Sequence, residues 1–135
     1  LYESKDKEVS DDDVLKIILD KSYLKHKHRP HLIAVPTTAG TGSELTRWAT
    51  IWDVDHHAKL SIETPTLAFD EAIIVVEYTL SMPMKLTLST GLDALTQATE
   101  AYWAKSTSPS VQVLALQAIR LIVRNLPRVL ADPND

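Results

Sequence analysis

The sequence contains no cysteine, so it can form neither a disulfide nor a thiolate metal site. The formal net charge is −4, which argues against nucleic acid or an anionic membrane surface as a main partner. No apolar run approaches the roughly 18 residues of a membrane span, and no signal segment opens the chain. The absence of cysteine suits a reducing cytoplasm, which is the location we expect.

Glycine is also scarce, with three residues in 135, and two of the three lie close together in one segment. An apolar run at 32–35 is followed by Pro-Thr-Thr-Ala-Gly-Thr-Gly-Ser-Glu at 36–44. A strand that ends in glycines and small hydroxyls exposes backbone N–H groups and short donors, which suits an anionic or polar cofactor. The segment is neither a Gly-x-Gly-x-x-Gly fingerprint nor a P-loop, so generic nucleotide motifs do not account for it.

The first part of the chain combines residue patterns typical of helices with patterns typical of strands. Ser10 before three aspartates predicts a capped helix, whose apolar stripe begins at Val14. The spacing predicts a strand at 32–35, a hairpin over 46–62 and a fully buried strand at 72–76. Trp48 and Trp52 share a face of the hairpin, and core packing is the favoured role for both.

The second part is helical almost throughout. Pro83 suits the first turn of a helix, Thr90-Gly91 predicts a break, and a second helix is expected from about 92 to 105. Ser108 and Pro109 then predict the start of a last helix. We expect an α/β part over 1–82 followed by an all-α part over 83–135. Neither part is large enough to be self-sufficient, and the first residue is Leu rather than Met, so we expect a piece of a longer protein.

Two candidate sites, the Asp93–Gln97 pair and Lys59, each have a functional and a structural interpretation. Asp93 and Gln97 are four residues apart on one helix face, which favours either a metal or substrate site or an aspartate stabilised near a helix N-terminus. Lys59 follows the hairpin turn, where it either reaches a phosphate or ribose hydroxyl or lies on the surface at a strand edge. The residue spacing leaves both pairs of alternatives open.

Several separate motifs, in order, resemble the iron-containing (group III) alcohol dehydrogenase family. They are 36–44, Asp-Ala-Leu-Thr at 93–96, Glu-Ala-Tyr at 100–102, Ala-Ile-Arg-Leu-Ile at 118–122 and Asn-Leu-Pro at 125–127. The resemblance covers the chain from about His31 to its last residue. It implies the C-terminal portion of a Rossmann-like dinucleotide-binding domain, followed by the first helices of an all-α metal-binding domain.

The resemblance also implies roles for individual residues. The loop residues that match the family's contacts with NAD or NADP are Thr37, Thr38, Gly40, Thr41, Gly42 and Ser43. Lys59 matches a lysine that approaches the same cofactor, and Asp93 matches a ligand of Fe²⁺ or Zn²⁺. The complete protein is expected to be a homo-oligomer that uses the metal as a Lewis acid on a small aldehyde or alcohol.

The sequence departs from the family pattern at two places. The family's next metal ligand is a histidine, and this chain has Gln97, whose neutral amide oxygen is a weak ligand. Val75-Val76 stands where the family commonly has Asp-Pro. The family's pyrophosphate loop would lie upstream and two further metal-binding histidines downstream, so we predict no dehydrogenase activity for the isolated chain.

The substrate and the reaction class have alternatives. Residues 49–53, 89–93 and Trp103 are most similar to the branch that reduces phosphonoacetaldehyde. A relative that has lost its metal and serves as a binding or oligomerisation module is one alternative, which Gln97 favours. A lyase similar to dehydroquinate synthase is the other, although the 37–44 loop fits the alcohol dehydrogenases better.

Overall fold

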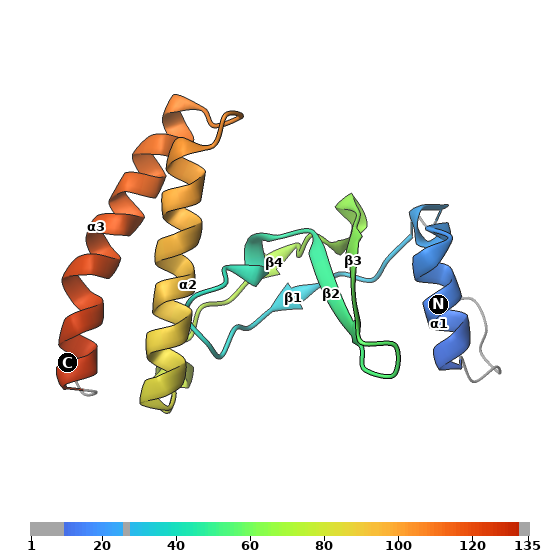
Figure 1. The fold of residues 1–135 in the computed structure, drawn as a ribbon, viewed down its shortest axis with the longest axis horizontal. Coiled ribbons are helices and arrows are strands. Elements are labelled where there is room, and N and C mark those ends of the chain that lie inside the picture. The colour runs from blue at the N-terminus through green and yellow to red at the C-terminus, as the bar shows by residue number, and fades with distance from the viewer. Residues whose placement is uncertain (1–9, 26–27, 133–135) are drawn as a thin grey trace. The chain divides into compact units, whose positions relative to one another are not determined.

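The computed structural model describes residues 10–25 and 28–132, which form two compact units (Figure 1). The first unit is drawn from Leu1–Leu32 and Leu45–Asp70, and the second from Ile33–Glu44 and Glu71–Asp135. The predicted fold class, an α/β part followed by an all-α part, is confirmed. Within the described residues, no helix combines the length and apolarity that crossing a bilayer requires.

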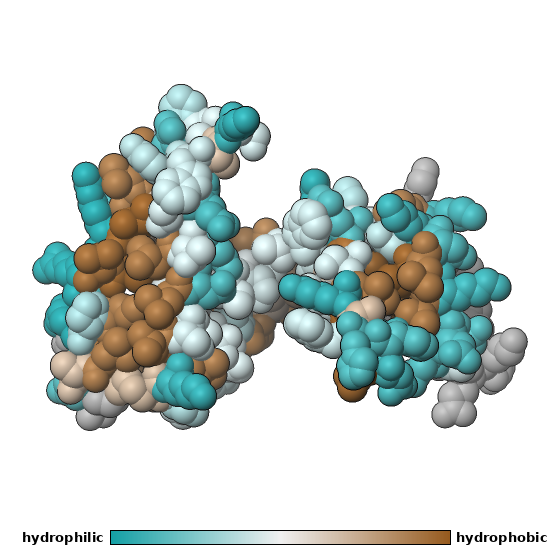
Figure 2. Space-filling view, viewed as in Figure 1, coloured by the Kyte–Doolittle hydropathy of each residue, from teal (hydrophilic) through white to brown (hydrophobic). Residues whose placement is uncertain are grey.

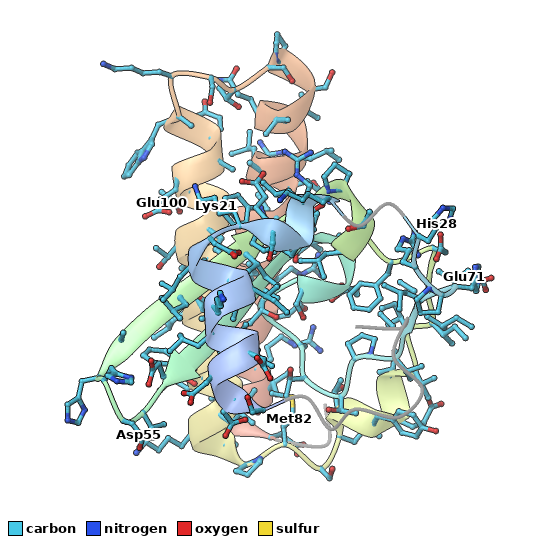
Figure 3. All side chains as sticks on the ribbon, turned by 90° about the vertical axis from the view of Figure 1, so that its right-hand side faces the viewer. Lys21, His28, Asp55, Glu71, Met82 and Glu100 are labelled. Carbon is cyan, nitrogen blue, oxygen red and sulfur yellow. The ribbon has the colours of Figure 1, made fainter. Side chains whose placement is uncertain are left out.

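The first unit contains α1 (Asp11–Leu19) and a hairpin of β2 (Trp48–Asp53) and β3 (Ala58–Glu63). The predicted cap of α1 is present, because the Ser10 hydroxyl accepts from the Asp13 N–H and the Asp13 carboxylate accepts from the Ser10 N–H. The predicted hairpin is also confirmed, with Trp48 opposite Glu63 and Asp53 opposite Ala58. Asp55 lies at its tip (Figure 3).

The prediction that the two hairpin tryptophans pack in a core was wrong. Alternate residues of β2 are exposed, and Trp48 and Trp52 keep 57% and 69% of their surface accessible. Their shared parity was correct, but the half-buried face is the opposite one, which carries Ala49 and Ile51. Residue spacing identifies a common face without saying which face is covered.

A charge-assisted contact joins two distant segments of the first unit. The Arg29 guanidinium donates through both terminal nitrogens to the Asp70 carboxylate, which also accepts from the Leu32 N–H at 2.8 Å. These donors, the arginine foremost, hold the pKa of Asp70 well below its ordinary range. Polar contacts of Asp70 therefore stabilise the first unit in addition to the hairpin hydrogen bonds.

The second unit contains a small parallel sheet and two long helices. Strand β1 (Ile33–Ala34) pairs with β4 (Glu71–Ala72), with Ile33 opposite Glu71. The helices α2 (Met84–Trp103) and α3 (Pro109–Ala131) pack along each other. As predicted, Ser108 caps α3, its hydroxyl accepting from the Val111 N–H, and Pro109 occupies the first turn.

Two predictions for this unit were wrong. The strand expected at 72–76 is limited to Glu71–Ala72, and Ile73 and Ile74 are 47% and 60% exposed. An apolar run is buried only where neighbours cover both faces, and in the described part of the chain β4 pairs with β1 alone. The break expected at Thr90-Gly91 is also absent, since α2 continues through both residues.

Gly91 serves helix packing rather than helix termination. A Cβ added there would lie 2.7 Å from Leu126 Cδ1, so the missing side chain lets α3 approach α2. The threonines of α2 are accommodated by hydroxyls that donate to carbonyls one turn back, as Thr96 does to Leu92 at 3.0 Å. Apolar side chains gather over these two helices (Figure 2).

Candidate active site

The small-residue loop at 37–43 lies in the second unit, between β1 and a short 3-10 helix, Ser43–Leu45. The side chains of Thr37, Thr38 and Thr41 are exposed, so the loop is open to a ligand on that side. The Ser43 N–H donates to the Thr41 hydroxyl at 3.4 Å, which bends the segment locally.

Both glycines of the loop adopt positive φ, at 152° for Gly40 and 62° for Gly42. Their surroundings differ. A Cβ on Gly40 would meet Thr90 of α2, with its Cβ at 2.5 Å and its backbone O at 2.7 Å, whereas one on Gly42 would have nothing within 4 Å. Gly40 is therefore the point where the loop backbone rests on α2.

This contact brings the loop close to the predicted carboxylate. Thr90 and Asp93 are three residues apart in α2, and residues at that spacing are neighbours on one helix face. Gln97 lies one turn further, and its Nε2 donates to Asp93 Oδ2 at 2.8 Å. Both side chains are exposed, as is Glu100, which projects from α2 (Figure 3).

A cavity of about 600 Å³ lies beside the loop contact, within the second unit. Ala39 and Gly40 line it from the loop, and most of the remaining lining comes from α2 and α3. Asp93 and Gln97 are not among its lining residues. The aspartate–glutamine pair therefore lies outside this cavity, on the exposed surface of α2.

Lys59 belongs to the first unit, where it lies on β3. It lies opposite Trp52 in the hairpin register, and its Nζ is 5.4 Å from the centre of the Trp52 ring. A cation over an aromatic face at this distance is attracted by the ring quadrupole. The exposed tryptophan therefore positions the lysine, whichever of its two predicted roles it has.

Thr90 is the site residue that sequence reasoning missed, having been assigned to a helix break. Nothing in the residue spacing links it to Gly40. The available signal was the glycine beside it, because a helix interior that tolerates Gly91 is typical of close packing.

The family model described as iron-containing alcohol dehydrogenase matches residues 6–75 of this chain. A second model, the C-terminal part of the Fe-containing alcohol dehydrogenase family, matches residues 87–135. Together they account for both the α/β and the helical parts of the chain.

Individual relatives agree with these matches. The chain is 42% identical over 106 residues to a choline dehydrogenase of Bacillus subtilis, covering 78% of the chain and 26% of that protein. It is 39% identical over 104 residues to an NAD-dependent methanol dehydrogenase of Bacillus methanolicus, covering 77% and 27%. The chain thus spans about a quarter of the length of these two relatives.

A solved structure matches the fold. The sulfoacetaldehyde reductase of Bifidobacterium kashiwanohense, in complex with NAD⁺, superposes with a TM-score of 0.76 and 39% identity. The match covers 81% of this chain and 29% of that one.

Proposed function

The chain belongs to the iron-containing alcohol dehydrogenase family, and on that premise we propose that it forms part of an NAD-dependent enzyme that interconverts a small aldehyde and its alcohol. The observation that carries the proposal is the exposed small-residue loop, which rests on α2 through Gly40, one helical turn from Asp93. The arrangement supports the proposal because the backbone proposed to bind the cofactor and the Asp93–Gln97 pair belong to the same compact unit.

The cofactor side of the proposal uses the loop residues as predicted. Exposed hydroxyls of Thr37, Thr38 and Thr41 and the backbone at Gly40 and Gly42 offer donors to the nicotinamide dinucleotide. Lys59 is proposed to contribute a positive charge to the same cofactor. One relative is named as NAD-dependent and one solved neighbour holds NAD⁺, which supports NAD over NADP.

The reaction is a hydride transfer. The nicotinamide C4–H bond breaks and its electron pair forms a C–H bond at the carbonyl carbon, while the carbonyl oxygen takes a proton from solvent to give the alcohol. The cofactor supplies the hydride chemistry, and the protein supplies orientation and electrostatics around the oxygen.

The predicted metal, Fe²⁺ or Zn²⁺, would have to bind through Asp93 and Gln97 in this part of the protein. A cation at Asp93 and Gln97 would need oxygen or nitrogen lone pairs from both, but Gln97 directs an amide N–H at the carboxylate. The Gln97 amide oxygen is neutral, which makes it a weak ligand for Fe²⁺ or Zn²⁺. The pair as it stands does not fit a metal, so no step is assigned to one.

The substrate proposed at finer detail is phosphonoacetaldehyde. The support is the similarity of residues 49–53 and 89–93 to that branch, together with a structural neighbour named for sulfoacetaldehyde, which is also an anionic aldehyde. An anionic substrate would need a cationic side chain in the complete site.

We also propose a domain boundary near residue 82 and a homo-oligomeric assembly. One family model ends at residue 75 and the other begins at residue 87, which supports a domain boundary near 82. Exposed apolar side chains of the second unit would be covered by the remainder of the family fold, in a cytoplasmic homo-oligomer.

The proposal is tested with the complete enzyme that carries this segment. NADH oxidation should follow addition of phosphonoacetaldehyde, with sulfoacetaldehyde and uncharged aldehydes as comparisons, and the isolated 135-residue chain should show none. Net consumption of NADH separates a dehydrogenase from a lyase that regenerates its NAD⁺. Binding of NAD⁺ without turnover of any aldehyde would favour the binding-module alternative.

A further inference from the structure

We infer that the Asp93–Gln97 pair acts as a metal-free hydrogen-bonding unit, in which Gln97 holds the carboxylate and offers its second N–H to the substrate oxygen. The inference deepens the proposed function and rests on it for the identity of the substrate. It concerns the step at which the reacting oxygen gains negative charge.

The geometry of the pair supports the first half of the inference. The distance from Gln97 Nε2 to Asp93 Oδ2 is 2.8 Å, which is the length of a charge-assisted hydrogen bond. The opposite amide orientation would place two oxygens at that distance, one of them charged, and they would repel each other unless a cation lay between them. In the absence of a cation, the chemistry therefore selects the orientation in which the N–H faces Asp93.

This orientation opposes metal binding. A divalent ion would have to break the bond and rotate the amide before Gln97 could contribute an oxygen. That oxygen is neutral and is a weaker ligand for Fe²⁺ or Zn²⁺ than an imidazole nitrogen. Since only Asp93 would then bind strongly, the pair favours its internal hydrogen bond over an ion.

The same orientation leaves one donor available. A glutamine amide has two N–H groups, and the Gln97 side chain makes no other hydrogen bond within residues 10–25 and 28–132. The side chain is exposed and lies two turns along α2 from Thr90, where the cofactor loop rests. An aldehyde oxygen bound beside this exposed face of α2 would accept this N–H.

A donor at this place would assist the reaction. As hydride reaches the carbonyl carbon, the oxygen becomes an alkoxide and its hydrogen bond strengthens, which lowers the barrier. The nearby Asp93 charge polarises the amide and fixes its direction. The amide keeps its protons, and the alkoxide takes its proton from water.

The metal half of the inference is tested on the 135-residue chain by titration with Zn²⁺, followed by calorimetry. Wild type and Asp93→Ala should bind Zn²⁺ with equal affinity, because the pair holds no ion. Gln97→His removes the donor and adds a nitrogen ligand, so its affinity should rise about 10- to 100-fold, the range by which metal-site partners alter affinity.

The matched control is Gln117→His, which adds a histidine to α3 at an exposed glutamine with Val113, not an acid, four residues before it. Tighter Zn²⁺ binding by wild type than by Asp93→Ala would overturn the inference, and so would equal affinities for Gln97→His and Gln117→His. The comparison with Asp93→Ala remains decisive if Gln97→His fails to fold.

The donor half is tested in the complete enzyme with Gln97→Met, which keeps the side-chain length and removes both N–H groups. We expect kcat/KM for the aldehyde to fall about 10²- to 10³-fold with NAD⁺ affinity unchanged, as for loss of an oxyanion-hole donor. Loss of wild-type activity on chelation, restored by Zn²⁺ or Fe²⁺, would contradict the inference. Absence of both NAD⁺ binding and turnover in wild type would instead reject the proposed function, leaving the Zn²⁺ comparison intact.

Discussion

The hairpin of the first unit and the loop–helix site of the second differ in how far apart in the sequence their defining contacts lie. In the first unit, a capped helix and a hairpin form from residues close in sequence. The Arg29–Asp70 ion pair then joins the segment before the hairpin to the segment after it. In the second, β1 pairs with β4 and the loop at 37–43 rests on α2, so the site depends on contacts between distant segments. Local signals build the hairpin that carries Lys59, whereas tertiary packing builds the loop–helix site.

The largest effect is expected from Gly40→Ala, which disrupts the contact between the loop and Thr90 of α2. The new Cβ would overlap Thr90 at Cβ and at its backbone O, and a backbone atom cannot rotate away. We expect the second unit to lose about 1–3 kcal/mol, as in other overpacked sites, with the loop displaced from α2. Denaturant unfolding and the amide NMR signals of Thr90 and Gly91 measure both effects.

Gly42→Ala is the matched control for that change. It also places a side chain at positive φ, but nothing lies within 4 Å of the new Cβ. Only the conformational cost, about 1–2 kcal/mol, should appear, and the Thr90 signal should not move. If the two variants shifted the Thr90 signal equally, the conclusion that the loop rests on α2 through Gly40 would be wrong.

A smaller and purely local effect is expected when the first unit is acidified. The pKa of Asp70 is lowered by the Arg29 guanidinium and the Leu32 N–H, so its folded value lies below its unfolded one. Its contribution is complete above the unfolded value near 3.8 and is lost as pH falls through the folded value. Unfolding followed from pH 7 to pH 2 should show the first unit weakening below about pH 4.

Asp70→Asn should weaken the first unit already at pH 7 and flatten its response to acid. Asp55→Asn removes a charge from the hairpin tip without removing an ion pair, and serves as the control. An unchanged acid response in Asp70→Asn would show that other groups fasten this unit.

Lys59→Met is expected to have a small effect on stability. The substitution keeps the apolar stem and removes the cation above Trp52, which costs about 0.5–1 kcal/mol at an exposed site. NAD⁺ affinity of the complete enzyme should fall more than stability does if Lys59 contacts the cofactor. Equal NAD⁺ affinity in wild type and variant would leave the lysine with a surface role only.

The smallest effect is expected from Gly91→Ala. The new Cβ would meet Leu126 Cδ1 and Cδ2 at 2.7 and 2.9 Å, but these are the ends of a flexible side chain that borders the cavity. The gain in helix propensity, about 1 kcal/mol, offsets the repacking, so denaturant unfolding should change little. A large loss would mean that the α2–α3 contact is as rigid as the Gly40 contact.

The same division explains what the sequence could predict. Ser10, Ser108 and the alternation in β2 are local signals, and each predicted its cap or strand correctly. The break at Gly91 and the buried strand at 72–76 were wrong because helix continuity and burial depend on neighbours distant in sequence. The site residues Asp93 and Gln97 were chosen from spacing and resemblance, but their mutual hydrogen bond required coordinates.

The most direct test of the account is a titration of the isotope-labelled chain with NAD⁺, followed by amide NMR. The account predicts that signals from 37–43 and from Thr90–Asp93 shift together with one affinity, and that Gly40→Ala removes both responses. Shifts in the loop without any in α2, or no shift at saturating NAD⁺, would contradict a shared site.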